Sequence, residues 1–148
     1  MDIQEIVATA RAFDGVLVVT LEAGSGLPEL AWGDVFVYYA PDGVMPERTQ
    51  PYATVVTKNY PGDEASKLDE PGRFRVNIHV GRERVAELTD AAARPAATDT
   101  FVRHPLYGDV GWVSIVNPGP VTSGMVLTLL RDAHEAARTR VIRRSKGS

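Results

Sequence analysis

Two histidines lie where an imidazole could take part in acid or base chemistry near neutral pH. His104 opens the turn His-Pro-Leu-Tyr, and His79 lies near the end of a stretch in which apolar and polar residues alternate. With a partner within hydrogen-bond reach, either imidazole could accept a proton from a substrate. We therefore name His104 and His79 as catalytic candidates, with Asp34 and Tyr107 as the side chains that would assist them.

A second set of polar and aromatic residues is suited to holding a ligand. Lys58 would meet an anionic group, although it would equally form a cross-strand pair with Asp34. Asn77 can bind an amide or hydroxyl group of a ligand, or satisfy the backbone of a loop. Aromatic rings on one concave face would suit a planar small molecule, whereas scattered rings would belong to the core and rim. The ligand-binding candidates are Trp32, Tyr38, Lys58, Asn77, Arg82 and Trp112.

Each histidine also has a purely structural interpretation. His104 would hydrogen-bond its own turn and pack on Trp112, and His79 would be a structural or solvated strand residue. His134 falls near the polar boundary of the last helix, where we expect it at the surface. The four carboxylates within residues 63–70 lack the spacing of an EF-hand and indicate a solvated loop.

Sequence motifs for metals and common cofactors are missing. A catalytic zinc site needs three ligands, which only a convergence of His79, His104 and Asp34 would supply, because no His-x-His or His-x-x-x-His pair occurs. Gly24-Ser25-Gly26 lacks the Lys and Ser/Thr of a phosphate loop. No Gly-x-Ser-x-Gly elbow and no dinucleotide fingerprint are present. We expect neither a metal nor a cofactor.

A small number of strands and helices must position these candidates. Phe74, Val76, Ile78 and Val80 alternate with polar residues, which is typical of a half-buried central strand. Asp2 can cap a first helix, and Pro120 would begin the last one. The remaining predicted elements are strands over residues 16–21, 32–39, 53–58 and 111–117, a loop over 22–28 and a helix over 82–93.

The order of helix, four strands, helix, strand and helix indicates a single α+β domain over residues 1–148. Because hairpin-length links join most strands, we expect a largely antiparallel five-stranded sheet. The N-terminal, middle and C-terminal helices would pack on one face of this sheet. We expect the basic tail over residues 143–148 to be disordered. An exposed edge strand would allow a homodimer as well as a monomer.

Composition restricts the class of protein further. The chain has 148 residues, 44% apolar and 24% charged, which is typical of one globular domain. It contains no cysteine, which excludes disulfides and a cysteine nucleophile and suits a reducing cytoplasm. We see no signal peptide and no apolar stretch long enough for a membrane span, and we expect a cytoplasmic protein. The net charge of -3 disfavours a nucleic-acid partner.

The order of several motifs is familiar. These are Trp32-Gly33-Asp34, a strand ending in Lys58, the strand over 74–78, His104-Pro-x-Tyr107 and Trp112-Val113 before a closing helix. Over almost the whole chain they resemble a family of uncharacterised proteins common in actinobacteria. More distantly, the pattern is similar to the MmcQ/YjbR-like superfamily. The resemblance implies a small α+β fold with a curved antiparallel sheet, and it implies no particular reaction.

Three functional hypotheses follow. The first is a non-enzymatic domain that binds a small ligand or a protein partner across its sheet. The second is a small enzyme, of specialised metabolism, in which His104 or His79 serves as the general base. The third is a nucleic-acid-binding module that uses Arg73, Arg75, Arg82 and the basic last helix. The acidic net charge of the chain argues against this third hypothesis.

Overall fold

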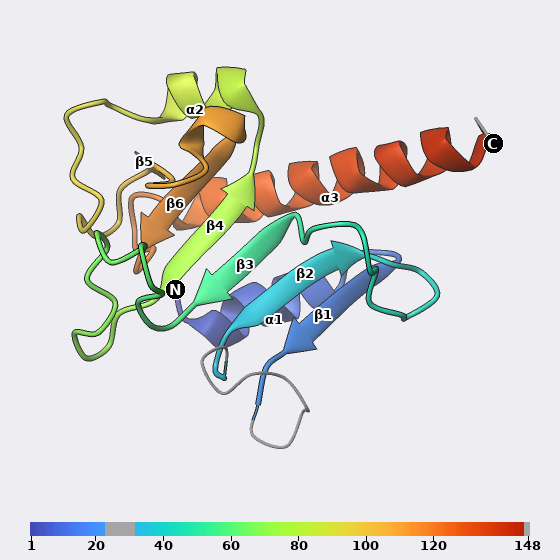
Figure 1. The fold of residues 1–148 in the computed structure, drawn as a ribbon, viewed down its shortest axis with the longest axis horizontal. Coiled ribbons are helices and arrows are strands. Elements are labelled where there is room, and N and C mark those ends of the chain that lie inside the picture. The colour runs from blue at the N-terminus through green and yellow to red at the C-terminus, as the bar shows by residue number, and fades with distance from the viewer. Residues whose placement is uncertain (23–31, 147–148) are drawn as a thin grey trace.

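A computed structural model of the protein describes residues 1–22 and 32–146, and most of these are built around one sheet (Figure 1). Within the described residues the sheet has six strands in the order β1-β2-β3-β4-β6-β5. All five neighbouring pairs are antiparallel. The strands are β1 (Val16–Thr20), β2 (Val35–Tyr39), β3 (Ala53–Val56), β4 (Arg75–His79), β5 (Val102–Arg103) and β6 (Trp112–Val116). The predicted α+β class and antiparallel sheet are confirmed.

The predicted number of five strands is wrong, because β5 is an additional edge strand. It contains only two residues, Val102 opposite Ser114 and Arg103 opposite Val113. Two residues are too few to produce an alternating pattern that the sequence could reveal. The strand matters for the site, because His104 follows it directly.

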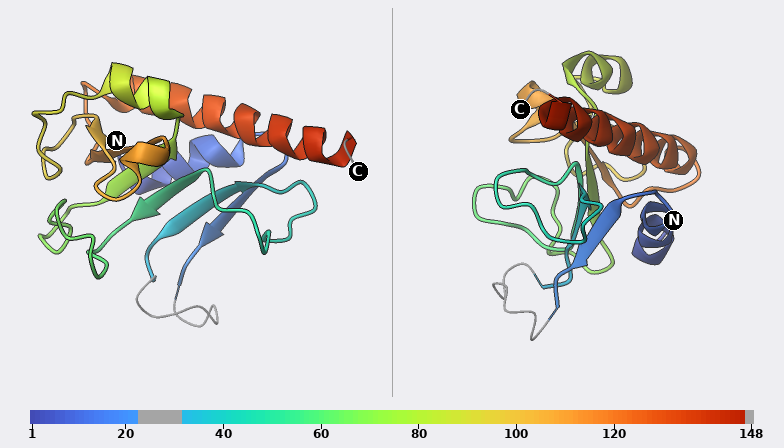
Figure 2. Two further views of the ribbon diagram at one scale, coloured as in Figure 1. Left: turned by 45° about the horizontal axis from the view of Figure 1, so that its top comes forward. Right: turned by 90° about the vertical axis from the view of Figure 1, so that its right-hand side faces the viewer.

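Three helices accompany the sheet in the described part of the chain: α1 (Ile3–Arg11), α2 (Arg82–Leu88) and α3 (Ser123–Lys146). Both α1 and α3 lie behind the sheet in Figure 1, and the turned views of Figure 2 show them on the same side of it. Apolar residues of all three helices join one core with every second residue of the central strands. The prediction that the helices pack on one face is therefore confirmed. The core on the central strands comprises Val35, Val37, Ala53, Val55, Val76, Ile78, Val113 and Ile115.

Two helix boundaries differ from the predicted ones for local reasons. The middle helix ends at Leu88 rather than near residue 93, because Thr89 is extended and its hydroxyl donates to the Val85 carbonyl at 2.7 Å. The last helix begins at Ser123 rather than at Pro120. The preceding backbone N–H groups bind the carboxylate of Asp99 instead of starting a helical turn.

Elsewhere the boundaries follow the sequence more closely. Asp2 caps α1 as predicted, accepting the Glu5 N–H at 2.9 Å. The last helix continues through Lys146, so residues 143–146, which we expected in a disordered tail, are helical. Most of the loop predicted over 22–28, including Gly24-Ser25-Gly26, lies outside the described residues. No helix in the described ranges is both long and apolar enough to cross a membrane.

Candidate functional site

A pocket of about 400 Å³ lies over β3, β4 and β6. Residues of these strands that line it alternate with the residues that pack on α1 and α3, so it occupies the opposite face of the sheet. Its walls are mainly apolar and aromatic, and its floor is polar. The lining residues are Phe36, Gln50, Pro51, Thr54, Val56, Tyr60, Pro61, Asp63, Arg75, Asn77, His104, Leu106, Tyr107 and Trp112.

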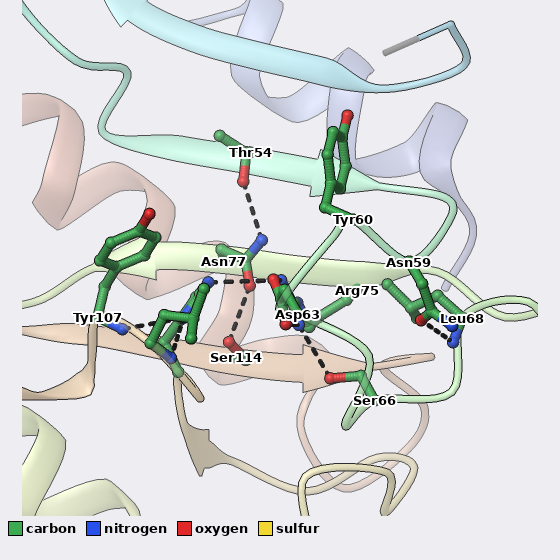
Figure 3. A network of polar contacts seen from close by, with 12 residues as sticks. Thr54, Asn59, Tyr60, Asp63, Ser66, Leu68, Arg75, Asn77, Tyr107 and Ser114 are labelled. Carbon is green, nitrogen blue, oxygen red and sulfur yellow. Dashed lines mark hydrogen bonds and ion pairs between the residues drawn. The ribbon is translucent and has the colours of Figure 1, made fainter. Parts of the chain in front are cut away.

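A chain of hydrogen bonds crosses the floor of the pocket from strand to strand (Figure 3). Thr54, Asn77 and Ser114 are direct partners in the β3–β4 and β4–β6 registers. The Asn77 amide donates to the Thr54 hydroxyl at 3.0 Å and accepts from the Ser114 hydroxyl at 2.8 Å. These contacts fix the Asn77 amide, and its second N–H is not used in them.

The charged part of the pocket is a buried ion pair. Arg75, at the start of β4, is only 2% exposed and binds Asp63 with both terminal nitrogens, at 2.9 and 2.6 Å. It also donates to the Ser66 hydroxyl at 2.9 Å. Figure 3 shows Asp63 and Ser66 approaching Arg75 from the loop that precedes β4. The hydrogen bond from Arg75 lowers the pKa of Asp63 despite its burial.

His104 lies next to this ion pair and is 6% exposed. Its Nδ1 accepts the backbone N–H groups of Leu106 and Tyr107, each at 3.1 Å, and its Nε2 lies 3.4 Å from Arg75 Nη2. Burial and then the positive charge of Arg75 lower its pKa to about 4, against the opposing effect of Asp63. The predicted hydrogen bond to its own turn is present. The ring packs on Tyr107, with centroids 4.9 Å apart.

His79 lies outside the pocket. Its Nε2 donates to the Val110 carbonyl at 3.1 Å, and its ring makes an edge contact with Trp112 at a centroid distance of 5.6 Å. Burial lowers the pKa of His79, with a smaller opposing effect from the Val110 hydrogen bond. Of the two candidate histidines, His104 lines the pocket and His79 does not, so they do not share this site. Trp112, which His79 contacts, does line it.

Asp34, Lys58 and Trp32 form a separate cluster at the start of β2 and the end of β3. Asp34 accepts the backbone N–H and the hydroxyl of Thr57, each at 2.9 Å, and also the Tyr60 hydroxyl. Lys58 lies 3.5 Å from the same carboxylate and donates to the Trp32 carbonyl. The cross-strand pair is therefore formed, and Tyr60, which binds Asp34 of this cluster, lines the pocket.

The structure thus separates the ten candidates. Four of them line the pocket: Asn77, His104, Tyr107 and Trp112. Tyr38 is buried on β2 without lining it, and Arg82 is the first residue of α2, away from it. The remaining four are His79 and the members of the Asp34 cluster.

Several lining residues were not identified from the sequence. Asp63 lies in the loop that we interpreted as solvated, yet it is buried against Arg75. Arg75 itself was proposed to contact nucleic acid, and its burial contradicts that role. Thr54 is a polar residue within an otherwise apolar strand, which is the one signal that marked a polar face on β3.

His134 is buried in the core, which corrects the prediction of a surface position. Its Nδ1 accepts from the Tyr52 hydroxyl at 2.9 Å, and its Nε2 donates to the Asp14 carbonyl at 2.8 Å. The rings of Phe13 and Tyr39 lie against it, with centroids 5.1 and 5.5 Å away. His134 therefore joins α3 to the turn between α1 and β1 and does not line the pocket.

A metal site requires several ligand side chains that converge in space. Among the described residues no group of three or more His, Cys, Asp or Glu side chains is arranged to hold a metal ion. His79, His104 and Asp34, which would have had to converge to supply three zinc ligands, do not share a site, since of the three only His104 lines the pocket.

Nothing among the curated proteins matches the chain. No solved structure matches it either. A family model described as a family of unknown function, DUF6194, matches residues 1–146. This covers nearly the whole sequence, and the chain therefore belongs to the DUF6194 family.

Proposed function

We propose that the protein binds a small organic molecule in the pocket over β3, β4 and β6. The observation that carries this proposal is the combination of apolar walls with a buried, fixed polar floor. Known ligand sites have this character, in which aromatic and apolar walls supply affinity and a few polar groups set the orientation. A volume of about 400 Å³ lies within the range of such sites.

The walls indicate the shape of the ligand. Phe36, Tyr60, Tyr107 and Trp112 all line the pocket, so four of the surrounding side chains carry aromatic rings. Aromatic side chains provide large contact areas and favour stacked or edge contacts with other rings. Tyr107 is 53% exposed, and a flat molecule in the pocket would cover part of this ring.

The geometry supports this function better than the two alternatives. In the described chain His104 contacts Arg75 and two backbone amides rather than a nucleophile or an orienting carboxylate, so the pairing typical of nucleophilic catalysis is not formed. For nucleic acid, Arg75 is buried, and Arg73 donates to the carbonyls of Ser66 and Ala96 at 2.9 and 2.6 Å. Two of the three arginines are therefore used internally.

We also propose, as a separate point, that the chain is distantly related to the MmcQ/YjbR-like superfamily. The order of a leading helix, an antiparallel sheet and a closing helix supports it. Superposition of an experimental structure of this chain on members of that superfamily tests the relation. A different strand order in those members would reject it.

The binding proposal is tested by a fragment screen followed by ¹H–¹⁵N NMR. The probes are rigid aromatic compounds of one or two rings, such as indole, quinoline and naphthalene derivatives. We expect bound fragments to shift the backbone amides of Thr54, Asn77, Leu106 and Trp112, and to raise the melting temperature by mass action. Binding confined to the surface between α2 and α3, or no fragment that shifts the pocket amides, would reject the proposal.

Two variants make the screen specific. Tyr107→Ala removes an exposed aromatic wall, and we expect it to weaken the bound fragments about tenfold. Val121→Ala is the matched control, because Val121 is also an exposed apolar residue, 81% exposed, but does not line the pocket. Equal weakening by both variants would show that the contact with Tyr107 is not specific.

A further inference from the structure

We propose that His104 is a neutral hydrogen-bond donor that, together with Arg75, recognises an uncharged acceptor oxygen, such as a ketone or amide carbonyl, on a planar ligand. This inference rests on the proposed function and names the chemical class of the ligand. It assigns His104 a role in recognition, in place of the general base that the sequence suggested.

The first step is the position of the imidazole hydrogen. Two backbone N–H groups, from Leu106 and Tyr107, point at Nδ1 from 3.1 Å each, so Nδ1 accepts and carries no hydrogen. A neutral imidazole holds one hydrogen, and in His104 it must then be on Nε2. The turn that follows β5 thus fixes the tautomer through main-chain groups that every residue type except proline would supply.

The second step is what this hydrogen meets. Nε2 lies 3.4 Å from Arg75 Nη2, and a guanidinium has donors and no acceptor. Two donors therefore lie side by side on buried residues that both line the pocket. Arg75 Nη2 already donates one hydrogen to Asp63 at 2.6 Å, whereas the Nε2 hydrogen faces a second donor. A buried donor without an acceptor is costly, so an oxygen that accepts from Nε2 and from the second hydrogen of Nη2 would be favoured there. Neutral imidazoles of fixed tautomer are known to act in this way on carbonyl oxygens.

The third step is the charge of the ligand. Arg75 and Asp63 are the only charged side chains among the described residues that line the pocket. Both oxygens of Asp63 bind the guanidinium, so the two charges compensate each other. A carboxylate or phosphate placed beside them would bring a second negative charge close to Asp63 with no further cation to balance it. An uncharged acceptor oxygen avoids that cost.

The tautomer is tested directly by long-range ¹H–¹⁵N NMR of the histidine rings, assigned with His104→Asn. We expect one His104 nitrogen to have the chemical shift of a protonated ring nitrogen at Nε2 and the other that of an unprotonated one at Nδ1. The pattern should hold from pH 8 to pH 6. A hydrogen on Nδ1, or averaged shifts for the two nitrogens, would overturn the assignment.

The ligand class is tested with three probes of similar shape. These are 2-acetylnaphthalene, which offers a neutral carbonyl, 2-isopropenylnaphthalene, which lacks the oxygen, and 2-naphthoate, which is an anion. We expect the ketone to bind about tenfold more tightly than the alkene, as one buried hydrogen bond allows. We expect 2-naphthoate to bind more weakly than the ketone. Tightest binding of 2-naphthoate would overturn the inference.

A matched pair of variants assigns the effect to His104. In His104→Asn the side-chain oxygen replaces Nδ1 as the acceptor for the turn, while the Nε2 donor is lost. We expect this variant to stay folded and the ratio of ketone to alkene affinity to fall toward one. His104→Ala loses both contacts and should also be less stable. An unchanged ratio in His104→Asn would reject His104 as the donor.

The failure of this inference can be told from the failure of the proposed function. If all three probes shift the pocket amides with equal affinity, the pocket binds planar molecules but does not select a carbonyl group. If none of the three shifts these amides while other fragments do, the ligand class is wrong and the pocket is still a binding site. Only the absence of every fragment from the pocket rejects both.

Discussion

Arg75 and Asp63 form a bidentate ion pair that ties β4 to the loop preceding it, with contacts of 2.9 and 2.6 Å. The pair is buried under the pocket, where each charge depends on the other for its solvation. It also brings Ser66 to the guanidinium and sets the position of the nitrogen that faces His104. The loop conformation and the polar floor of the pocket are therefore one structural unit.

The ion pair predicts strong coupling between two substitutions. Asp63→Ala leaves the buried guanidinium without its partner and should lower the free energy of unfolding by about 3–5 kcal/mol. Arg75→Met should lower the free energy of unfolding by a similar amount, because it leaves the buried Asp63 carboxylate without its partner. The double variant removes both charges, so we expect it to be more stable than either single variant. Urea unfolding of the wild type, the two single variants and the double variant measures the coupling free energy between Asp63 and Arg75. Additive losses would contradict a direct pair.

The depressed pKa of His104 predicts a loss of stability in mild acid. The pKa is about 4 in the folded protein against 6.5 for an unperturbed histidine. Between these values the unfolded chain binds the proton more readily, so stability falls as the pH drops from 6.5 to 4 and is fully present above that window. Allowing for partial solvation, the loss is about 2 kcal/mol. Arg75 and Asp63 are the charged groups that face the ring, and they act in opposite directions.

The His104 contribution can be isolated by comparison with His104→Asn. Burial lowers the pKa of His79 as well, so its protonation destabilises the fold in the same direction. The Asn variant keeps His79 and the turn acceptor but cannot titrate at position 104. We expect its urea stability to vary less between pH 7 and pH 4 than that of the wild type. Parallel pH curves would mean that the folded His104 titrates normally.

The sequence predicts the architecture because apolar periodicity reports burial directly. Val76 and Ile78 alternate with Asn77 as a half-buried strand requires, and they pack on the helices as expected. The same alternation correctly placed Asn77 on the polar face. Residue type alone identified three further lining residues, His104, Tyr107 and Trp112. The pairing of β5 with β6, and the turn between these strands, bring them to the same pocket.

The polar floor was not predictable in the same way. Arg75 alternates with apolar neighbours like any solvent-facing strand residue, so its periodicity does not distinguish burial beneath a loop from exposure. Its partner Asp63 lies 12 residues earlier, within a run of acidic residues where nothing marks one as buried. The contact between Asn77 and Ser114 depends on the register of β4 and β6, and a separation of 37 positions along the chain leaves that register open.

Asp99 predicts a second, more acidic pH effect. Its carboxylate accepts the Thr122 hydroxyl at 2.6 Å and the N–H groups of Gly119, Val121 and Thr122 at 2.8–3.0 Å, before the start of α3. These bonds, led by that of the Thr122 hydroxyl, lower the pKa of Asp99 from 3.8 to about 2. A depressed carboxyl pKa stabilises the fold above 3.8, and the contribution is lost as the pH falls from 3.8 toward 2.

Asp99→Asn tests this assignment. The variant keeps a side chain that tolerates the positive φ of 50° at this position but removes the charge near the helix start. We expect a lower melting temperature than that of the wild type at pH 7, and a difference that shrinks between pH 4 and pH 2. Asp99→Ala should be less stable than Asp99→Asn. A difference that stays constant with pH would show that the charge of Asp99 does not contribute.

The buried hydrogen bond between Tyr52 and His134 predicts how much stability is lost when the Tyr52 hydroxyl group is removed. Tyr52→Phe keeps the ring in the core but leaves His134 Nδ1 without its donor at 2.9 Å, so we expect a loss of about 1–2 kcal/mol in urea unfolding. Tyr38→Phe is the matched control: Tyr38 is also buried, at 7% exposure, and its hydroxyl makes no hydrogen bond in the described chain. That variant should change stability by less than about 0.5 kcal/mol. Equal losses in the two variants would show that the cost does not come from the bond to His134.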